Sequence, residues 1–257
     1  MFKKIRVFLL SFALFFIGVD AWLTMVRSTD WDYPLLVTIY PINAQASDKV
    51  QRYINRLSVD DFDGIEAFIA EQARAYGLPL TQPVRVELGQ QLAEVPDSPP
   101  TNASQLDSIV WSLKFRYWVW RMEQAKSNAS INVRLFVLYH DPNTTPRLAH
   151  STGLQQGLIG LINAYGDQRY KGSNQVVIAH ELLHTVGASD KYDQANNQPL
   201  HPYGYAEPAR RPLYPQRYAE LMGGRIPKSP RESEIPRSLS AVKIGPETAR
   251  EINWISQ

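Results

Sequence analysis

The sequence of 257 residues contains no cysteine. This absence excludes disulfide bonds, zinc sites built from thiolates and cysteine nucleophiles. Any site for a soft metal ion must therefore use histidine and carboxylate ligands. The absence of cysteine does not by itself fix the cellular compartment.

A large excess of charge of one sign is also absent. The chain has 27 basic and 25 acidic residues, and three of the basic residues and one acidic residue lie within the first 26 positions. The rest of the chain therefore holds 24 residues of each sign. Because this part has no net charge, it offers no electrostatic attraction to nucleic acid, and we expect no nucleic-acid partner.

The amino terminus is strongly apolar and reads MFKKIRVFLLSFALFFIGVDAWLTMVR. Three positive charges precede an apolar run from Val7 to Val19, which has the length of a signal-peptide core. If Asp20 is tolerated, the run continues to Val26 and has the length of a membrane anchor. Residues 1–27 are thus predicted to be either a signal anchor or a cleaved signal peptide. In both cases the positive-inside rule places residues 28 onward on the periplasmic or extracellular side.

Strands and helices are predicted to alternate irregularly along the remaining chain. Hydrophobic periodicity predicts strands over 33–42, 83–88, 131–140 and 153–166, the last near a sheet edge. It predicts helices within 59–79, 104–125, 173–186 and 245–255. We interpret the tryptophan-rich helix at 104–125 as an aromatic core helix. This order of elements predicts one domain of the α+β class with a mixed sheet.

The stretch HELLHTVGASD, residues 180–190, has the spacing of a metal site. His180 and His184 are four residues apart and lie on the same face of a helix, so both imidazoles can reach one ion. Glu181 is rotated by about 100° and stays free to take a proton from water. Gly187 can end the helix in the left-handed conformation, which turns the chain back and brings Asp190 in as a third ligand. The alternative is a core helix whose two histidines are satisfied by ordinary partners.

HELLHTVGASD resembles the extended HExxHxxGxxH/D motif of the metzincin zinc metalloproteases, with the aspartate of the snapalysin-like branch. Downstream, AELMGGRI at 219–226 resembles their methionine turn. The resemblance implies a metzincin-like zinc-protease domain over 28–257, with a zinc-site core at 153–226, an active-site helix and a C-terminal helix. It implies Zn²⁺ held by His180, His184 and Asp190, with Glu181 as general base and Met222 as an apolar floor. By analogy, the strand within 157–166 would be the cleft edge along which a peptide pairs.

Aspartate replaces the commoner third histidine, so other ligands stay open. A thermolysin-like site takes its third ligand from a glutamate well downstream, and Glu220 lies 36 residues after His184. Asp193 is a second nearby carboxylate. Tyr203 or Tyr205 could stabilise an oxyanion, although tyrosines in a proline-rich loop more often pack.

We therefore expect a zinc-dependent peptidase that acts on protein or peptide substrates outside the cytoplasmic membrane. One alternative is a zinc-stabilised binding or assembly protein without catalysis. Another is a hydrolase of a non-peptide amide that uses the same metal chemistry.

Overall fold

The computed structural model describes residues 12, 29–100, 104–124 and 133–255. The predicted membrane segment, within residues 1–27, lies outside the described residues apart from Phe12. Within the described ranges, no helix is both long enough and apolar enough to cross a membrane.

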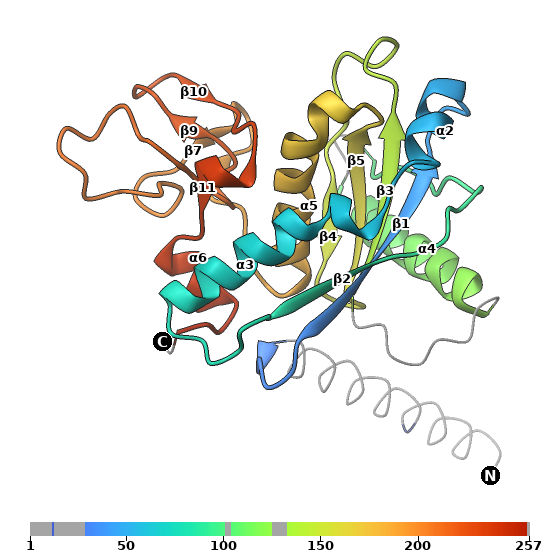
Figure 1. Ribbon diagram of the computed structural model, residues 1–257, viewed down its shortest axis with the longest axis horizontal. Coiled ribbons are helices and arrows are strands. Elements are labelled where there is room, and N and C mark those ends of the chain that lie inside the picture. The colour runs from blue at the N-terminus through green and yellow to red at the C-terminus, as the bar shows by residue number, and fades with distance from the viewer. Residues whose placement is uncertain (1–11, 13–28, 101–103, 125–132, 256–257) are drawn as a thin grey trace.

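A five-stranded mixed sheet forms the centre of the fold (Figure 1). Its strands are β1 (Leu35–Asn43), β2 (Val84–Leu88), β3 (Val133–His140), β4 (Thr152–Leu154) and β5 (Ile159–Tyr165). Their order across the sheet is β2-β1-β3-β5-β4, and only β4, at one edge, runs antiparallel to its neighbour. The prediction of intermixed helices and strands around a mixed sheet is confirmed.

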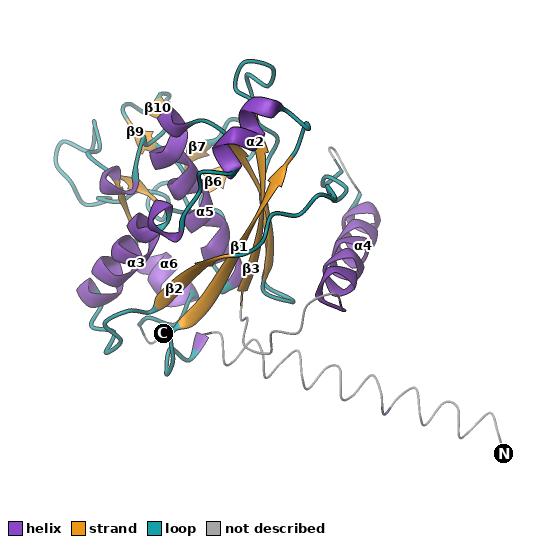
Figure 2. Cartoon of the chain, turned by 45° about the vertical axis from the view of Figure 1, so that its right-hand side comes forward, coloured by secondary structure: helices purple, strands orange, loops and turns teal. Residues whose placement is uncertain are grey.

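Helices cover both faces of this sheet. They are α2 (Asp48–Ile54), α3 (Asp63–Ala75), α4 (Gln105–Gln124), α5 (Lys171–Thr185) and α6 (Pro246–Glu251), with 3-10 turns η1 (Val59–Asp61), η2 (Gln168–Tyr170) and η3 (Leu239–Ala241). Helices α3 and α5 pack on one face, and among the described helices α4 alone packs on the other (Figure 2). Strand β3 is accordingly apolar on both sides: Leu135 and Val137 join the α5 side and Phe136 joins the α4 side.

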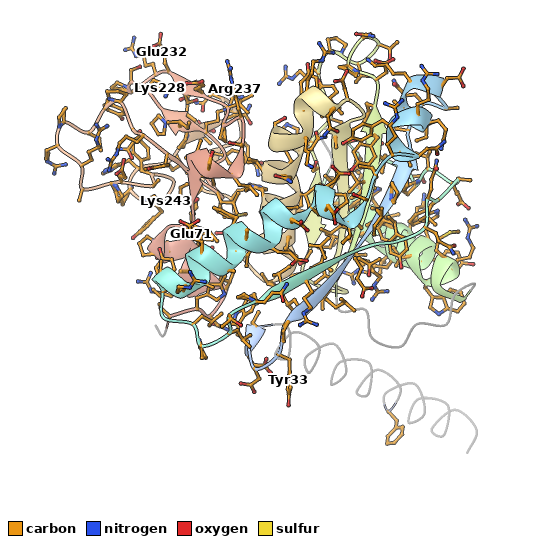
Figure 3. All side chains as sticks on the ribbon, viewed as in Figure 1. Tyr33, Glu71, Lys228, Glu232, Arg237 and Lys243 are labelled. Atoms are coloured by element: carbon orange, nitrogen blue, oxygen red, sulfur yellow. The ribbon has the colours of Figure 1, made fainter. Side chains whose placement is uncertain are left out.

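The C-terminal part of the chain, after α5, is mostly irregular. It contains the short strands β6 (Tyr192–Asp193), β7 (Gln198–Pro199), β8 (Ala219–Glu220), β9 (Ile226–Pro227), β10 (Ser233–Glu234) and β11 (Val242–Lys243). Helix α5 lies between these strands and the five-stranded sheet (Figure 1). Charged side chains of both signs, among them Lys228, Glu232 and Arg237, project outward from this part (Figure 3).

The predicted strand at 153–166 is wrong in one respect. The chain reverses within it, because Gly157 and Leu158 both adopt positive φ angles, of 96° and 50°. The result is two antiparallel strands, β4 and β5, instead of one. The edge of the sheet is β4, whereas β5 lies inside it between β3 and β4. The cleft-edge role predicted for 157–166 therefore cannot belong to β5.

Candidate metal centre

Helix α5 carries the motif and ends where the sequence predicts. Most of its side chains are buried, including Ile178, Leu182 and Leu183, so packing on both sides holds the helix in place. Gly187 adopts a φ of 102°, and the Ala188 amide donates to the Leu183 carbonyl at 3.0 Å. This glycine bend returns the chain toward the helix, as expected of a left-handed residue after a helix.

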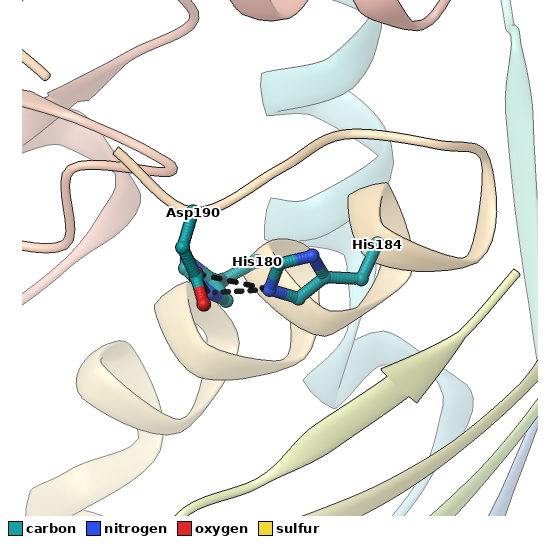
Figure 4. A group of neighbouring side chains, drawn as sticks. All are labelled: His180, His184 and Asp190. Carbon is teal, nitrogen blue, oxygen red and sulfur yellow. Dashed lines mark hydrogen bonds and ion pairs between the residues drawn. The ribbon is translucent and has the colours of Figure 1, made fainter. Parts of the chain in front are cut away.

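Three side chains meet at this bend (Figure 4). His180 Nε2 and His184 Nε2 each lie 3.1 Å from Asp190 Oδ1, and the two Nε2 atoms are 3.1 Å apart. The three side chains are 12 %, 17 % and 25 % exposed, so they are sheltered but remain reachable from solvent. The three atoms form a nearly equilateral triangle.

Backbone carbonyls hold both imidazoles in this orientation. His180 Nδ1 lies 2.9 Å from the Leu221 carbonyl, and His184 Nδ1 lies 2.8 Å from the Ala188 carbonyl. A carbonyl can only accept a hydrogen bond, so each Nδ1 carries a proton. In the neutral rings Nε2 is then an acceptor with its lone pair directed at the triangle. Three acceptors at 3.1 Å repel one another unless a cation, either a proton or a metal ion, lies among them.

The triangle fits a metal ion. A tetrahedral zinc ion with bonds of about 2.0–2.1 Å separates its ligand atoms by about 3.3 Å. The three separations of 3.1 Å are close to that value. The group can therefore hold a metal ion, and its two imidazole nitrogens and one carboxylate oxygen are ligands that zinc and other first-row metals accept.

Protonation competes with a metal ion at this site. Burial lowers the pKa of His180, but the Asp190 hydrogen bond, nearby negative charges and the Leu221 carbonyl outweigh burial and raise it to about 9. Burial raises the pKa of Asp190, but hydrogen bonds from the two histidines bring it well below its usual value. At neutral pH the metal-free cluster therefore retains a proton that a metal ion must displace.

We accordingly expect zinc affinity to rise with pH. Below the His180 pKa of about 9, each pH unit should raise the apparent affinity by about tenfold, because one proton is released on binding. Titrations against a chromophoric chelator at several pH values measure this slope. A flat profile below the pKa would show that no proton leaves the cluster.

Glu181 lies beside the cluster with one oxygen free. Its side chain is buried, and the Gly153 amide donates a hydrogen bond to its carboxylate. The second oxygen, Oε2, is buried and has no hydrogen-bond partner among the described residues. Burial raises the pKa of Glu181, although the neighbouring histidines oppose this. A carboxylate with a raised pKa and an unpaired oxygen is suited to accept a proton from a water molecule.

Gly153 of β4 allows the sheet edge to approach the motif closely. A Cβ atom at this position would lie 2.5 Å from the Glu181 carbonyl oxygen and 2.6 Å from His184 Cβ. Only glycine permits this contact, which also brings the Gly153 amide to the Glu181 carboxylate. Strand β4 and helix α5 therefore lie in direct contact at the candidate site.

The loop that carries Asp190 is clamped by helix α6. Glu251 of α6 accepts hydrogen bonds from the Ser189 amide at 3.0 Å, from the Ser189 hydroxyl and from Lys191 Nζ at 2.6 Å. Lys191 is buried and also donates to the Ser189 carbonyl. Because both neighbours of Asp190 are held in this way, the carboxylate is positioned before a metal ion binds.

The Glu251→Gln variant tests this clamp. Glutamine removes the negative charge that balances buried Lys191, so the Asp190 loop should loosen and zinc affinity should fall by about 10–100-fold. Glu247→Gln, on the same helix but paired with Arg250, is the matched control and should bind zinc as the wild type does. Equal zinc affinity in both variants would show that the clamp is irrelevant to the metal.

Met222, Tyr203 and Tyr205 were also predicted to belong to the site. Met222 is fully buried in the main core, and the carbonyl of its neighbour Leu221 is the one that orients His180. Tyr203 is exposed, and Tyr205 pairs with Tyr214 through their hydroxyls at 2.7 Å, so neither is brought to the cluster.

The two rival carboxylates have other partners. Asp193 accepts hydrogen bonds from the Ala195 amide and the Asn196 side chain and so closes the β6–β7 turn. Glu220 is completely buried, and both of its oxygens are engaged, by the amides of Gly223 and Gly245 and by Thr248. Neither belongs to the triangle.

Tyr192 is a neighbour of the site that the sequence analysis missed. Its hydroxyl forms a hydrogen bond with Asp190, and its ring centroid lies 6.4 Å from that of His180. Burial, together with the negative charge of Asp190, raises its pKa well above the usual value, so the phenol stays protonated. Tyr192 lies two residues after Asp190, on the strand that leaves the loop, and this position in the sequence could have identified it as a neighbour of the site.

A cavity of about 310 Å³ adjoins the cluster. His180, Glu181 and Tyr192 border it, and its apolar lining comes from Leu148, Val176, Val177, Leu221, Ile235 and Pro236. A larger cavity of about 420 Å³ lies beneath α2 and Gly166–Gln168 and contains none of the cluster residues. The first cavity can therefore receive part of a substrate at the site.

Comparisons with known proteins provide no family assignment. No protein-family model matches the chain, and no curated protein matches it.

Proposed function

We propose that the protein is a zinc-dependent peptidase of the metzincin type. The observation that carries this proposal is the triangle of three acceptor atoms at 3.1 Å beside a buried carboxylate with an unpaired oxygen. His180, His184 and Asp190 would hold the ion. When bound, zinc supplies Lewis acidity, which polarises a carbonyl group and makes a water molecule easier to deprotonate.

Glu181 performs the proton transfers. It takes a proton from the attacking water while the water oxygen forms a bond to the carbonyl carbon of the peptide. It then gives that proton to the nitrogen as the carbon–nitrogen bond breaks. The raised pKa of Glu181 suits both steps, because a weakly acidic carboxyl group is a better base and can still act as an acid.

The sheet edge supports a peptide as the substrate. In the part of the chain that the structure describes, no strand pairs with the outer side of β4. An extended peptide can add to such an edge through backbone hydrogen bonds. The cavity of about 310 Å³ next to Glu181 would then take one of its side chains, preferably an apolar one.

A non-catalytic zinc protein is less well supported. A structural zinc site is closed by four protein ligands, whereas three are brought together here among the described residues. A buried carboxylate with a free oxygen also has no use in a purely structural site.

Removal of the metal tests the proposal directly. We expect the purified protein to contain zinc and to cleave a mixture of peptides. A zinc chelator should abolish cleavage, and added zinc should restore it. Cleavage that resists full metal removal would reject the mechanism. A zinc-loaded protein that cleaves no member of a broad peptide library would favour the binding or assembly alternative.

A further inference from the structure

Helix α4 exposes a continuous apolar face to solvent. We call this face the α4 stripe. Its side chains, which are between 50 % and 73 % exposed, are Leu106, Ile109, Val110, Leu113, Tyr117 and Trp120. Six of the thirteen exposed large apolar side chains among the described residues thus lie on one helix. Such a concentration marks a contact surface, because isolated exposed apolar residues are ordinary whereas patches are not.

The stripe is distinct from the face that packs on the sheet. Its residues are spaced by three and four positions and fall within an arc of about 100° around the helix. The opposite side carries Trp111, Phe115 and Trp118, which are buried against β3 and its neighbours. The helix is therefore apolar on two sides, and only one of them is covered by the described chain.

Cations border the stripe on both sides, and one exposed carboxylate, Asp107, lies on the Lys114 side near the start of the helix. By helical position, Lys114 and Arg121 lie along one border and Arg116 lies along the other. Arg116 donates to Gln156 at 2.9 Å and Arg121 pairs with Glu94, so Lys114 and Arg116 remain without a carboxylate partner among the described ion pairs. The rings of Tyr117 and Trp120 stack with centroids 5.7 Å apart. Apolar residues with aromatics and flanking cations are typical of helices that lie in the interface of an anionic bilayer.

The start of the domain is held rigidly. Trp31 is buried, its indole N–H donates to the Ile252 carbonyl at 2.7 Å, and its ring packs on that of Trp254. Three Cα–Cα steps, at most about 11 Å, separate Val26 at the end of the apolar N-terminal run from Thr29. If that run is the predicted anchor, the domain is fixed close to the membrane surface.

The C-terminal end of helix α4 lies at the same end of the domain as the start of the described chain. The helix connects β2 to β3, two parallel strands on either side of β1, so it runs antiparallel to them. Its C-terminal end, with Tyr117 and Trp120, therefore lies at the end of the sheet where β1 begins (Figures 1 and 2). Tyr33, which is 81 % exposed, projects from the same end (Figure 3).

From these observations we infer that the α4 stripe docks on a phospholipid bilayer, the one to which the predicted N-terminal anchor would attach the protein. The stripe enters the boundary between headgroups and acyl chains, and Lys114 and Arg116 contact anionic headgroups. The metal centre lies on α5, on the other face of the sheet, so the site faces away from the bilayer (Figure 2).

The absence of cysteine allows a direct test. The full chain carrying Leu113→Cys is labelled with an environment-sensitive fluorophore and reconstituted into vesicles of phosphatidylcholine and phosphatidylglycerol. The matched control is Leu200→Cys, an exposed leucine outside the stripe. Quenching is measured with a nitroxide carried on lipid acyl chains and, separately, with aqueous iodide. Both leucines are more than half exposed, so neither substitution removes a core side chain.

The inference predicts opposite behaviour of the two labels. The label at position 113 should be quenched by the lipid nitroxide and protected from iodide, and the label at position 200 should be quenched by iodide alone. Equal access of iodide to both labels would overturn the proposal. Protection at position 113 without lipid quenching would also overturn it, because the stripe would then be covered by protein, either the N-terminal segment or a second copy.

Discussion

Replacement of Glu181 by glutamine is expected to lower the rate of peptide cleavage by about 10²- to 10⁴-fold, the usual contribution of a general acid–base group. Glutamine keeps the shape of the side chain and an oxygen that can accept from the Gly153 amide. It cannot take a proton from water. The ligands His180, His184 and Asp190 are untouched, so the zinc content should equal that of the wild type. Cleavage kinetics and metal analysis on the same preparation measure both effects.

Asp193→Asn is the matched control for Glu181→Gln. This carboxylate lies near the site in sequence but closes the β6–β7 turn, so its loss should leave cleavage unchanged. A Glu181→Gln variant that cleaves peptides at the wild-type rate would remove this residue from the mechanism. Loss of zinc together with activity would instead indicate that Glu181 supports the metal.

The His184→Ala variant should lose both zinc and activity. One of the three atoms of the triangle disappears, and the 3.1 Å contacts of His184 with His180 and Asp190 disappear with it. Mutation of a residue that only hydrogen-bonds to a metal ligand typically lowers metal affinity by about 10–100-fold. The loss of a direct ligand should therefore weaken zinc binding by more than about 100-fold. Competition with a chelator of known affinity gives the dissociation constant.

His201→Ala provides the comparison for His184→Ala. His201 is exposed and lies outside the cluster, with its nearest polar partner, the Pro208 carbonyl, at 3.4 Å. Its removal should not alter zinc binding. Full zinc stoichiometry in His184→Ala, with unchanged affinity, would refute the assignment of this site.

The cluster of His180, His184 and Asp190 could be predicted because its residues are local in sequence. The helical repeat alone brings His180 and His184 to one face, and the positive φ of Gly187 returns the chain to Asp190. Gly187 was identifiable because glycine after the last apolar position of a helix commonly takes this conformation. Both relations involve no distant part of the chain.

The parts that could not be predicted depend on distant contacts or on short reversals. Apolar residues lie on both sides of Gln155 and Gln156, so we predicted the two short strands as one, and the turn at Gly157 and Leu158 that separates them was not predicted. Glu251 contacts Ser189 across 62 positions, which no local pattern reveals. The position of Glu220 in the sequence made it a plausible metal ligand. In the structure its carboxylate instead accepts hydrogen bonds from the Gly245 amide and the Thr248 hydroxyl, at the start of α6, which no local pattern predicts.

The clamp on the Asp190 loop has a consequence for biosynthesis. The two histidines leave the ribosome while Glu251, 60 positions beyond Lys191, has still to be translated. A nascent chain at that stage can form helix α5 but has nothing to hold the third ligand. For the proposed peptidase, full metal affinity and the activity that depends on it would therefore arise late, after α6 has been made and has docked.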